Sequence, residues 1–390
     1  MTATTVHHAL SRVTSGGRFI PAIDGLRCIA ILAVVLYHLE DYVVHKHPHW
    51  NTADYATTWL HRVLHIGGCG VPLFFAISGF ILGLPFIEAR LGQRPKVKLS
   101  SYYWRRVTRL EPPYLINLAV MAILLVLVKD ASFDELWPHW LASAGYVHGL
   151  IYGTMSTINF VAWSLEVEVQ FYLIAPFLAA GLYAPSRWMR RGLVASVIGV
   201  LMVGKIANGG PLITSWSFAL PNYLDHFLVG LLLADIYASD WNGAPSLHGN
   251  GDLLALAGWG GVLATQLVNG MYYWLPVFTF IAFAGSLRGQ YSRKLLTQPL
   301  IVVIGGMCYT IYLYHFALIS AAGRFLIGLW PNAGYVPTLA LHVAVLVPLV
   351  LVVSAVLFWL FEKPFMAWRG VGWPRWELSV ASAPTSVTRS

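Results

Sequence analysis

The sequence contains little charge. Asp, Glu, Lys and Arg make up only 11% of its 390 residues, whereas soluble domains carry about 25%. Hydrophobic residues make up 57% of the chain, and the mean hydropathy is +0.64. At this length the composition excludes an ordinary soluble domain and predicts a polytopic membrane protein, which has the lipid bilayer as a partner.

Cysteine and an apolar leader are also lacking. The only cysteines are Cys28, Cys69 and Cys308, and this scattered, odd-numbered set excludes a disulfide framework or a cysteine metal site. The first 20 residues are polar, so no removable signal peptide is expected. The net charge of +8 comes without a basic module interleaved with aromatics and without zinc-finger spacing, so no nucleic-acid partner is expected.

Long apolar segments are what the sequence does have. Since a spanning helix needs about 20 mostly apolar residues, the expected fold class is all-α, a polytopic membrane helical bundle of about ten transmembrane helices. The predicted spans are 26–44, 68–87, 110–128, 165–184, 193–207, 217–237, 252–269, 271–287, 300–321 and 338–361. A further stretch, 139–152, is too polar and too short to span and is expected to be re-entrant or interfacial.

The loops between these spans alternate in charge. The loops 88–109, 185–192 and 287–299 are rich in Lys and Arg, and the opposite loops 129–164 and 208–216 are poor in them. By the positive-inside rule both termini are expected to be cytoplasmic, in a multi-pass protein of the cytoplasmic (inner) membrane. The predicted division is an N-terminal tail 1–20, a membrane domain 21–368 and a disordered tail 369–390.

The first predicted span carries two ionisable residues on one face. Arg27 and His38 are eleven residues apart, which is about three helical turns plus about 20°. Ionisable groups inside a span usually face a cavity or a partner, so the pair is a candidate functional site. The alternative is a packed core histidine with an arginine that reaches the helix end or pairs with Asp24.

A basic stretch opens the third predicted span. Arg106 and Arg109 are three residues apart and therefore share a helix face. Two forked cations on one face suit a phosphate ligand. The alternative is ordinary positive-inside anchoring.

Two acidic residues lie near the start of the fourth predicted span. Glu166 and Glu168 are two residues apart, so they face different sides of a helix and are not expected to form a general acid/base pair. Glu168 is expected to be the deeper of the two and to have a His or Arg partner. Glu166 is expected to be a solvated acid at the start of the helix.

Other polar residues fall inside or beside predicted spans, where either packing or a polar pore explains them. The candidates are Asp24, Ser78, Trp163, Ser164, Asp225, Tyr312, His315 and Glu362. An outer loop also contains His45, His47, His49, His61 and His65. Because these histidines lack regular ligand spacing, no metal site is expected.

Taken in chain order, these motifs resemble those of the acyltransferase-3 family of membrane acyltransferases. The resemblance runs from about residue 23 to about residue 365. It rests on IDGLR followed by ten residues and His38, GVPLFFAISGF around Ser78, YYWRRVTRLEPPY with Arg106 and Arg109, WSLEVEVQFY with Glu168, IGGMCYTIYLYHF with His315, and FEKPF with Glu362. One departure is YLDHF at 223–227, where the family usually has Arg-Leu-Asp-Glu-Phe, so that a cation is missing beside Asp225.

This resemblance implies the transfer of an acyl group, most often acetyl, from coenzyme A to a hydroxyl of a carbohydrate or glycosylated acceptor. Acyl-CoA would be a substrate, and no permanently bound cofactor is expected. The resemblance implies catalytic roles for His38, as base or acyl carrier, and for Glu168, which would orient His38. Arg27, Arg106, Arg109 and Ser78 would bind the donor. The chain would be a stand-alone acyltransferase without a hydrolase-like domain.

The acceptor stays open between an exopolysaccharide, a lipopolysaccharide sugar and a secondary metabolite such as a macrolide. Two other classes of function also fit a polytopic bundle with buried polar groups. One is a transporter or channel for a small polar solute, and the other is a structural subunit of an assembly.

Overall fold

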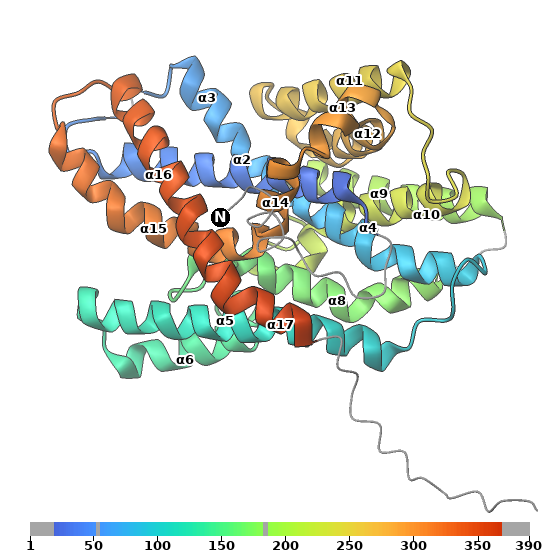
Figure 1. Ribbon diagram of the computed structural model, residues 1–390, viewed down its shortest axis with the longest axis horizontal. Coiled ribbons are helices and arrows are strands. Elements are labelled where there is room, and N and C mark those ends of the chain that lie inside the picture. The colour runs from blue at the N-terminus through green and yellow to red at the C-terminus, as the bar shows by residue number, and fades with distance from the viewer. Residues whose placement is uncertain (1–18, 52–54, 182–185, 369–390) are drawn as a thin grey trace, which may run out of the picture.

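The computed structural model describes residues 19–51, 55–181 and 186–368, in which the regular secondary structure is helical (Figure 1). This confirms the predicted all-α class. Apart from residues 19 and 20, both predicted tails lie outside the described residues.

The longer helices of the first half are α2 (Pro21–Lys46), α4 (Gly70–Arg90), α5 (Leu99–Lys129), α8 (Trp163–Gly181) and α9 (Arg187–Asn208). Those of the second half are α10 (Leu224–Ser239), α11 (Gly249–Leu267), α12 (Leu275–Arg288), α15 (Cys308–Leu329) and α16 (Tyr335–Leu357). The shorter helices are α3 (Trp59–His65), α6 (Phe133–Ala144), α7 (His148–Tyr152), α13 (Gln290–Leu296), α14 (Pro299–Gly306) and, after α16, α17 (Lys363–Trp368).

Seven helices of the described chain are long and apolar enough to cross a membrane. They lie at Pro21–Lys46, Trp59–Arg90, Leu99–Lys129, Phe160–Ala180, Arg187–Asn208, Cys308–Leu329 and Tyr335–Met366. The other three predicted spans coincide with α10, α11 and α12, which have 16, 19 and 14 residues. The count of ten spans and the orientation of the termini stay predictions.

One predicted span differs in detail from the structure, whereas the stretch that was expected not to span agrees with it. The span predicted at 300–321 is interrupted at Met307, so that α14 ends and α15 begins there. The interruption follows Gly305, whose missing Cβ lets α14 lie against the backbone oxygen of Asp24. The stretch 139–152 falls in α6 and α7, of 12 and 5 residues, and neither is long enough to span a bilayer.

The helices that carry the site are held by close backbone contacts. A Cβ on Gly79 of α4 would lie 2.0 Å from the carbonyl oxygen of Phe227, and one on Gly230 of α10 would lie 1.8 Å from that of Ala76. Only glycine allows α4 and α10 to approach this closely. Of the two explanations considered for Ser78, close packing is therefore present, since Gly79 lies beside it and fixes its position.

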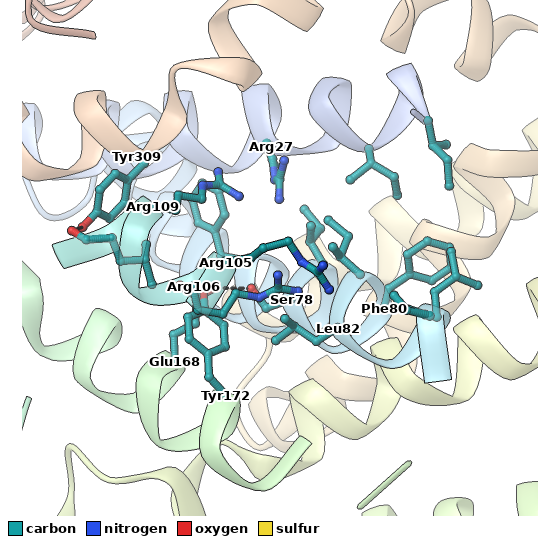
Figure 2. Close-up of a pocket in the computed structure, with 18 of the residues that line it drawn as sticks. Arg27, Ser78, Phe80, Leu82, Arg105, Arg106, Arg109, Glu168, Tyr172 and Tyr309 are labelled. Atoms are coloured by element: carbon teal, nitrogen blue, oxygen red, sulfur yellow. Dashed lines mark hydrogen bonds between the residues drawn. The ribbon is translucent and has the colours of Figure 1, made fainter. Parts of the chain in front are cut away.

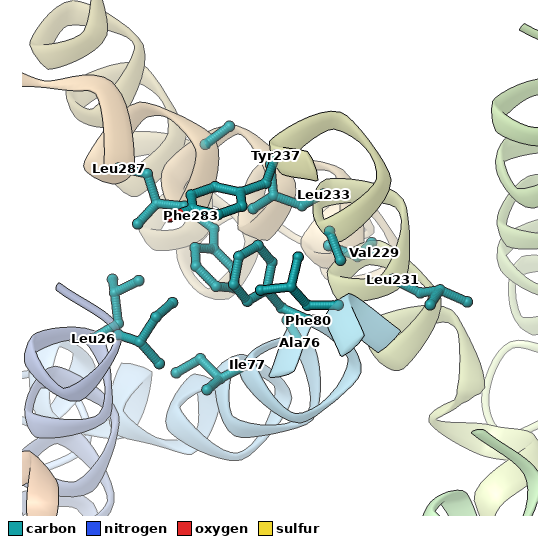
Figure 3. Close-up of a cluster of buried hydrophobic side chains, with 14 of the residues drawn as sticks. Leu26, Ala76, Ile77, Phe80, Val229, Leu231, Leu233, Tyr237, Phe283 and Leu287 are labelled. Carbon is teal, nitrogen blue, oxygen red and sulfur yellow. The ribbon is translucent and has the colours of Figure 1, made fainter. Parts of the chain in front are cut away.

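A buried apolar cluster joins α2, α4, α10 and α12 (Figure 3). Leu26 of α2, Phe80 of α4 and Phe283 of α12 are fully buried in it. The Phe80 and Phe283 rings lie 5.4 Å apart between their centroids. Because Leu26 precedes Arg27 directly, this packing also sets the direction of the Arg27 side chain.

A network of ion pairs ties α9 and α10 to the end of α4. The carboxylate of Asp235 accepts hydrogen bonds from Arg90 at 3.1 Å, from Arg190 at 2.9 Å and from Arg191 at 2.9 Å. The side chains of all four residues are at most 12% exposed. The negative charge of Asp235 therefore offsets the repulsion between three guanidinium groups that lie close together and are largely shielded from water.

Replacing Asp235 with Asn should destabilise the protein, because the arginines would lose the charge that holds them together. The loss of one partner from a buried ion pair costs about 3 kcal/mol or more. Thermal unfolding of the detergent-purified variant should show a clearly lower midpoint than that of the wild type. An unchanged midpoint would mean that the network contributes little to stability.

Candidate active site

A cavity of about 670 Å³ opens between the N-terminal end of α2, the middle of α4, the start of α5, α8 and α15. Its mouth is formed by residues of the basic loop, including Arg94, Lys96 and Lys98. Figure 2 shows Arg27 extending into this space from α2, opposite Ser78 on α4 and Glu168 on α8. The structure thus gathers the predicted donor-binding residues around one cavity.

Arg105, Arg106 and Arg109 bring a concentration of positive charge to the cavity. Their helix is anchored to α8 by Tyr102 and Tyr103, whose hydroxyls donate to the backbone oxygens of Tyr172 and Leu173 at 3.2 and 2.9 Å. The guanidinium of Arg106 also lies 4.7 Å from the centre of the Tyr102 ring. This anchoring holds the side chains over the cavity.

None of these three guanidinium groups forms an ion pair with a carboxylate anywhere in residues 19–51, 55–181 or 186–368. By contrast, Arg94 at the mouth is paired with Glu88 at 3.2 Å. Forked cations without a resident acid are arranged for an anionic ligand, and bidentate geometry suits phosphate. Positive-inside anchoring alone would not require the side chains to point into a cavity.

Arg27 is held by its own helix. Its Nη1 donates to Oδ1 of Asp24 at 2.6 Å, and both residues line the cavity. Of the two roles considered for Arg27, pairing with Asp24 is therefore present. The guanidinium is buried yet lines the cavity, so it adds a fixed, partly neutralised positive group to the cavity wall.

Glu168 lies at the centre of the cavity wall. One of its oxygens, Oε1, accepts hydrogen bonds from the hydroxyls of Ser78 and of Tyr172, the latter at 2.6 Å. Tyr172 follows Glu168 by one helical turn, a spacing that could have identified it from the sequence. These bonds link α4 to α8 across the cavity.

Tyr312 of α15 lines the cavity and is held by hydrogen bonds to α8 and the segment before it. Its hydroxyl lies 2.9 Å from the Ser164 hydroxyl and also donates to the backbone oxygen of Val161. Both Ser164 and Tyr312 line the cavity, whereas His38 does not. The predicted catalytic histidine, His38 of α2, is outside this lining, and so is His315, which follows Tyr312 by three residues on α15 with its ring 6.3 Å from that of Tyr312.

His38 is paired with a second histidine. Its Nδ1 lies 2.8 Å from Nε2 of His315, and the two rings are stacked with centroids 5.0 Å apart. Phe160 and Phe316 pack edge-on against His38. His38 of α2 and His315 of α15 thus form one unit within aromatic walls, in which His315 is fully buried and His38 is half-buried.

The hydrogen bonds of this pair fix its tautomers. Nδ1 of His315 lies 2.8 Å from the backbone oxygen of Tyr312, and a carbonyl can only accept, so this nitrogen carries the proton. Nε2 of His315 is then the acceptor for Nδ1–H of His38. It follows that the remaining nitrogen of His38, Nε2, has a free lone pair.

Two expectations about the acids need revision. The proposed contact between Glu168 and His38 is not supported, because the hydrogen bonds of Glu168 go to Ser78 and Tyr172 and that of His38 goes to His315. Glu166 is not a solvated acid either. It is only 1% exposed and accepts a bond from the backbone N–H of Gly149 at 2.8 Å, because α7 folds over the start of α8.

The remaining candidates lie outside the cavity lining. Asp225 is paired with Lys205 of α9 at 2.6 Å, so the cation missing from the local motif is supplied by another helix. Glu362 accepts a bond from Thr310 at 2.6 Å, and Trp163 packs against Phe75 and Tyr223. These three candidates serve the packing of the bundle.

The fold and the site define a class: a multi-pass membrane protein in which a cationic cavity lies beside a histidine pair. Within that class, the sequence profile of the family described as "Acyltransferase domain" matches residues 20–359. The chain therefore belongs to the acyltransferase-3 family, and it carries that enzyme family's acyltransferase domain. This confirms the resemblance seen in the sequence motifs.

Similar curated proteins come from Staphylococcus aureus. The chain is 25% identical over 337 residues to "Putative O-acetyltransferase SACOL0978" of strain COL, which covers 78% of this chain and 51% of that protein. It is 24% identical over 330 residues to "O-acetyltransferase OatA" of strain NCTC 8325, covering 77% and 51%. The chain thus spans about half the length of these relatives. No solved structure matches it significantly.

Proposed function

We propose that this protein transfers an acyl group, acetyl in the first instance, from cytoplasmic acyl-CoA to a hydroxyl of a carbohydrate or glycosylated acceptor. The observation that carries the proposal is a cavity lined by three arginines of α5 that form no ion pair with a carboxylate of the described residues, and whose lining residue Tyr312 lies beside His315 of the His38–His315 pair. The Staphylococcus aureus relatives are named as an O-acetyltransferase and a putative O-acetyltransferase, which supports acetyl as the acyl group.

The donor matches the charge of the cavity. Coenzyme A is a polyanion, and its phosphates would be bound by Arg105, Arg106 and Arg109 near the mouth. The pantetheine arm would follow the wall formed by Ser78 and Glu168 and bring the thioester to Tyr312. Since the basic loop is predicted to be cytoplasmic, the donor would arrive from the side on which it is made, in the inner membrane.

The chemistry would take place at Nε2 of His38. As the acceptor oxygen forms its bond to the thioester carbon, its proton passes to the free lone pair of Nε2. The carbon–sulfur bond then breaks, and the same proton goes to the leaving thiolate. His315 would hold the ring in the required tautomer and stabilise the imidazolium, as the buried carboxylate does in a serine protease triad.

The alternative route runs through an acylated His38, with the same nitrogen as the nucleophile. In that route the donor acylates His38 before the acceptor reacts. Incubation with radiolabelled acetyl-CoA alone would then leave a radiolabelled acetyl group on the protein. We propose the single-step route, which predicts that no labelled protein accumulates without acceptor. Label that depends on His38 would establish the two-step route instead.

Replacing both Arg106 and Arg109 with Gln should weaken coenzyme A binding. If each arginine makes one charged hydrogen bond to phosphate, the double change costs about 3 kcal/mol or more, which is a factor of about 100 in affinity. Calorimetry in detergent measures this directly. Lys294→Gln, which removes a cation of another basic loop outside the cavity, should leave the affinity unchanged.

If the double variant binds coenzyme A with unchanged affinity, the two arginines serve only as positive-inside membrane anchors. A wild-type protein that does not bind coenzyme A at all would instead favour the transporter or channel.

Changing His38 to Ala should reduce transfer by about 100-fold to 10,000-fold, the usual contribution of a general base. Coenzyme A affinity and protein yield should stay near those of the wild type, because His38 lies outside the cavity that binds the donor. The measurement is transfer of labelled acetyl from acetyl-CoA to acceptor in membranes. His45→Ala, an exposed histidine of the same helix, serves as the control. Full transfer by the His38 variant would disprove the catalytic role.

A further inference from the structure

A second cluster of polar side chains lies at the other end of α2. Glu40 is two residues beyond His38 and therefore faces away from it. It meets His61 and His65, which are four residues apart on one face of α3. In the sequence these histidines belong to a loop without regular ligand spacing. They reach the carboxylate of Glu40 only because α3 packs against α2.

The three side chains are close enough to share one ligand. Nδ1 of His61 lies 2.7 Å from Oε1 of Glu40, and Nδ1 of His65 lies 3.7 Å from Oε2. One potential ligand atom from each residue lies within 4.8 Å of those from the other two. In a tetrahedral zinc site with bonds of about 2.0 Å, ligand atoms are about 3.3 Å apart, so shifts of an ångström or so would suffice.

The carboxylate of Glu40 has no lysine or arginine partner in the described part of the chain. Glu40 is fully buried, and in the described part of the chain its only ion-pair partners are the two histidines. Tyr335 of α16 donates to Oε1 at 3.0 Å, whereas Oε2 is buried without a hydrogen-bond partner. Burying a carboxylate is costly unless it is paired or bound to a metal, so a cation beside Oε2 would be stabilising.

We propose that Glu40, His61 and His65 form a site for a divalent transition-metal ion of the zinc type. Two imidazoles and one carboxylate are a known zinc ligand set, in which the fourth position is left to water. The ion would occupy the space beside Oε2 and neutralise the buried carboxylate. The side chain of His65 is 50% exposed, so the ion can enter from the solvent side.

A metal at this site would fasten α3 to the end of the helix that carries His38. The ring of Tyr37 lies between the two places, 5.1 Å from His65 and 5.2 Å from His38 between ring centroids. The ion would thus fix the outer boundary of the His38 environment without contacting His38. Its binding is independent of coenzyme A and can be tested without any turnover.

The test is metal binding by the full-length protein, purified in detergent with an affinity tag that contains no histidine and then stripped with a chelator. Calorimetry with Zn²⁺ should show one tight site in the wild type. Co²⁺ should give the visible absorption of a tetrahedral complex. Removal of a residue that binds the metal directly should weaken the affinity for Zn²⁺ at least about 100-fold. Even residues that only support the ligands of a metal site change its affinity about 10-fold to 100-fold.

His65→Ala is the most informative variant, because this side chain is half exposed and its removal should leave the metal-free protein folded. Zn²⁺ should raise the unfolding temperature of the wild type but not that of this variant. His61→Ala should also lose the tight site, and His49→Ala, an exposed histidine of the same outer segment, should keep it. Equal Zn²⁺ affinity in the wild type, His61→Ala and His65→Ala would overturn the proposal and leave Glu40 with plain hydrogen bonds to histidine.

Discussion

Charges buried in this bundle need partners, and this requirement explains most of its architecture. Asp235 is surrounded by arginines from α4 and α9, and Asp225 is neutralised by Lys205. Such pairs fix helices that glycine contacts bring close together. Helices α4, α9 and α10 therefore form a rigid frame, and the cavity lies beside it.

The arginines of α5 that line the cavity differ from these pairs because they have no carboxylate partner among the described residues. Arg105, Arg106 and Arg109 converge on a cavity in which the nearby acids are already engaged, Asp24 by Arg27 and Glu168 by hydroxyl groups. A surplus of fixed positive charge is destabilising in itself and becomes favourable when a polyanion enters. The same reasoning, with the opposite sign, applies to Glu40 and its histidines.

Helix α2 connects these features. From its cytoplasmic end, as the loop charges predict it, the helix contributes Asp24 and Arg27 to the cavity, then His38 to the histidine pair, and then Glu40 to the outer cluster. Arg27 and His38 were expected to share a face because of their spacing. In the structure Arg27 lines the cavity, whereas His38 is outside the lining and contacts His315.

The sequence predicted a good deal of this arrangement. Apolar segments of spanning length indicated the helices, and motif order indicated the family and the residues Arg106, Arg109 and His38. It did not predict the partners of those residues. His315 and His38 are 277 positions apart, and Lys205 comes from a different helix than the motif it completes. Spacing along a helix determines which residues share a face, whereas contacts between distant helices depend on the packing of the whole bundle.

The burial of individual side chains was also poorly predicted from the sequence. Glu166 was expected in solvent because it lies near a helix start, but the short helix α7 covers it. Short helices of 5 to 12 residues, such as α6 and α7, leave little periodic signal in a sequence, and their effect on neighbouring side chains is therefore invisible there.

The central claim is that one cavity delivers an anionic acyl donor to the histidine pair. The most direct measurement is an experimental structure of the protein with coenzyme A bound, determined in nanodiscs. The account predicts the phosphates beside Arg105, Arg106 and Arg109 and the thiol against Tyr312, on the side facing His38. Coenzyme A bound elsewhere, or with its thiol directed away from Tyr312, would contradict it.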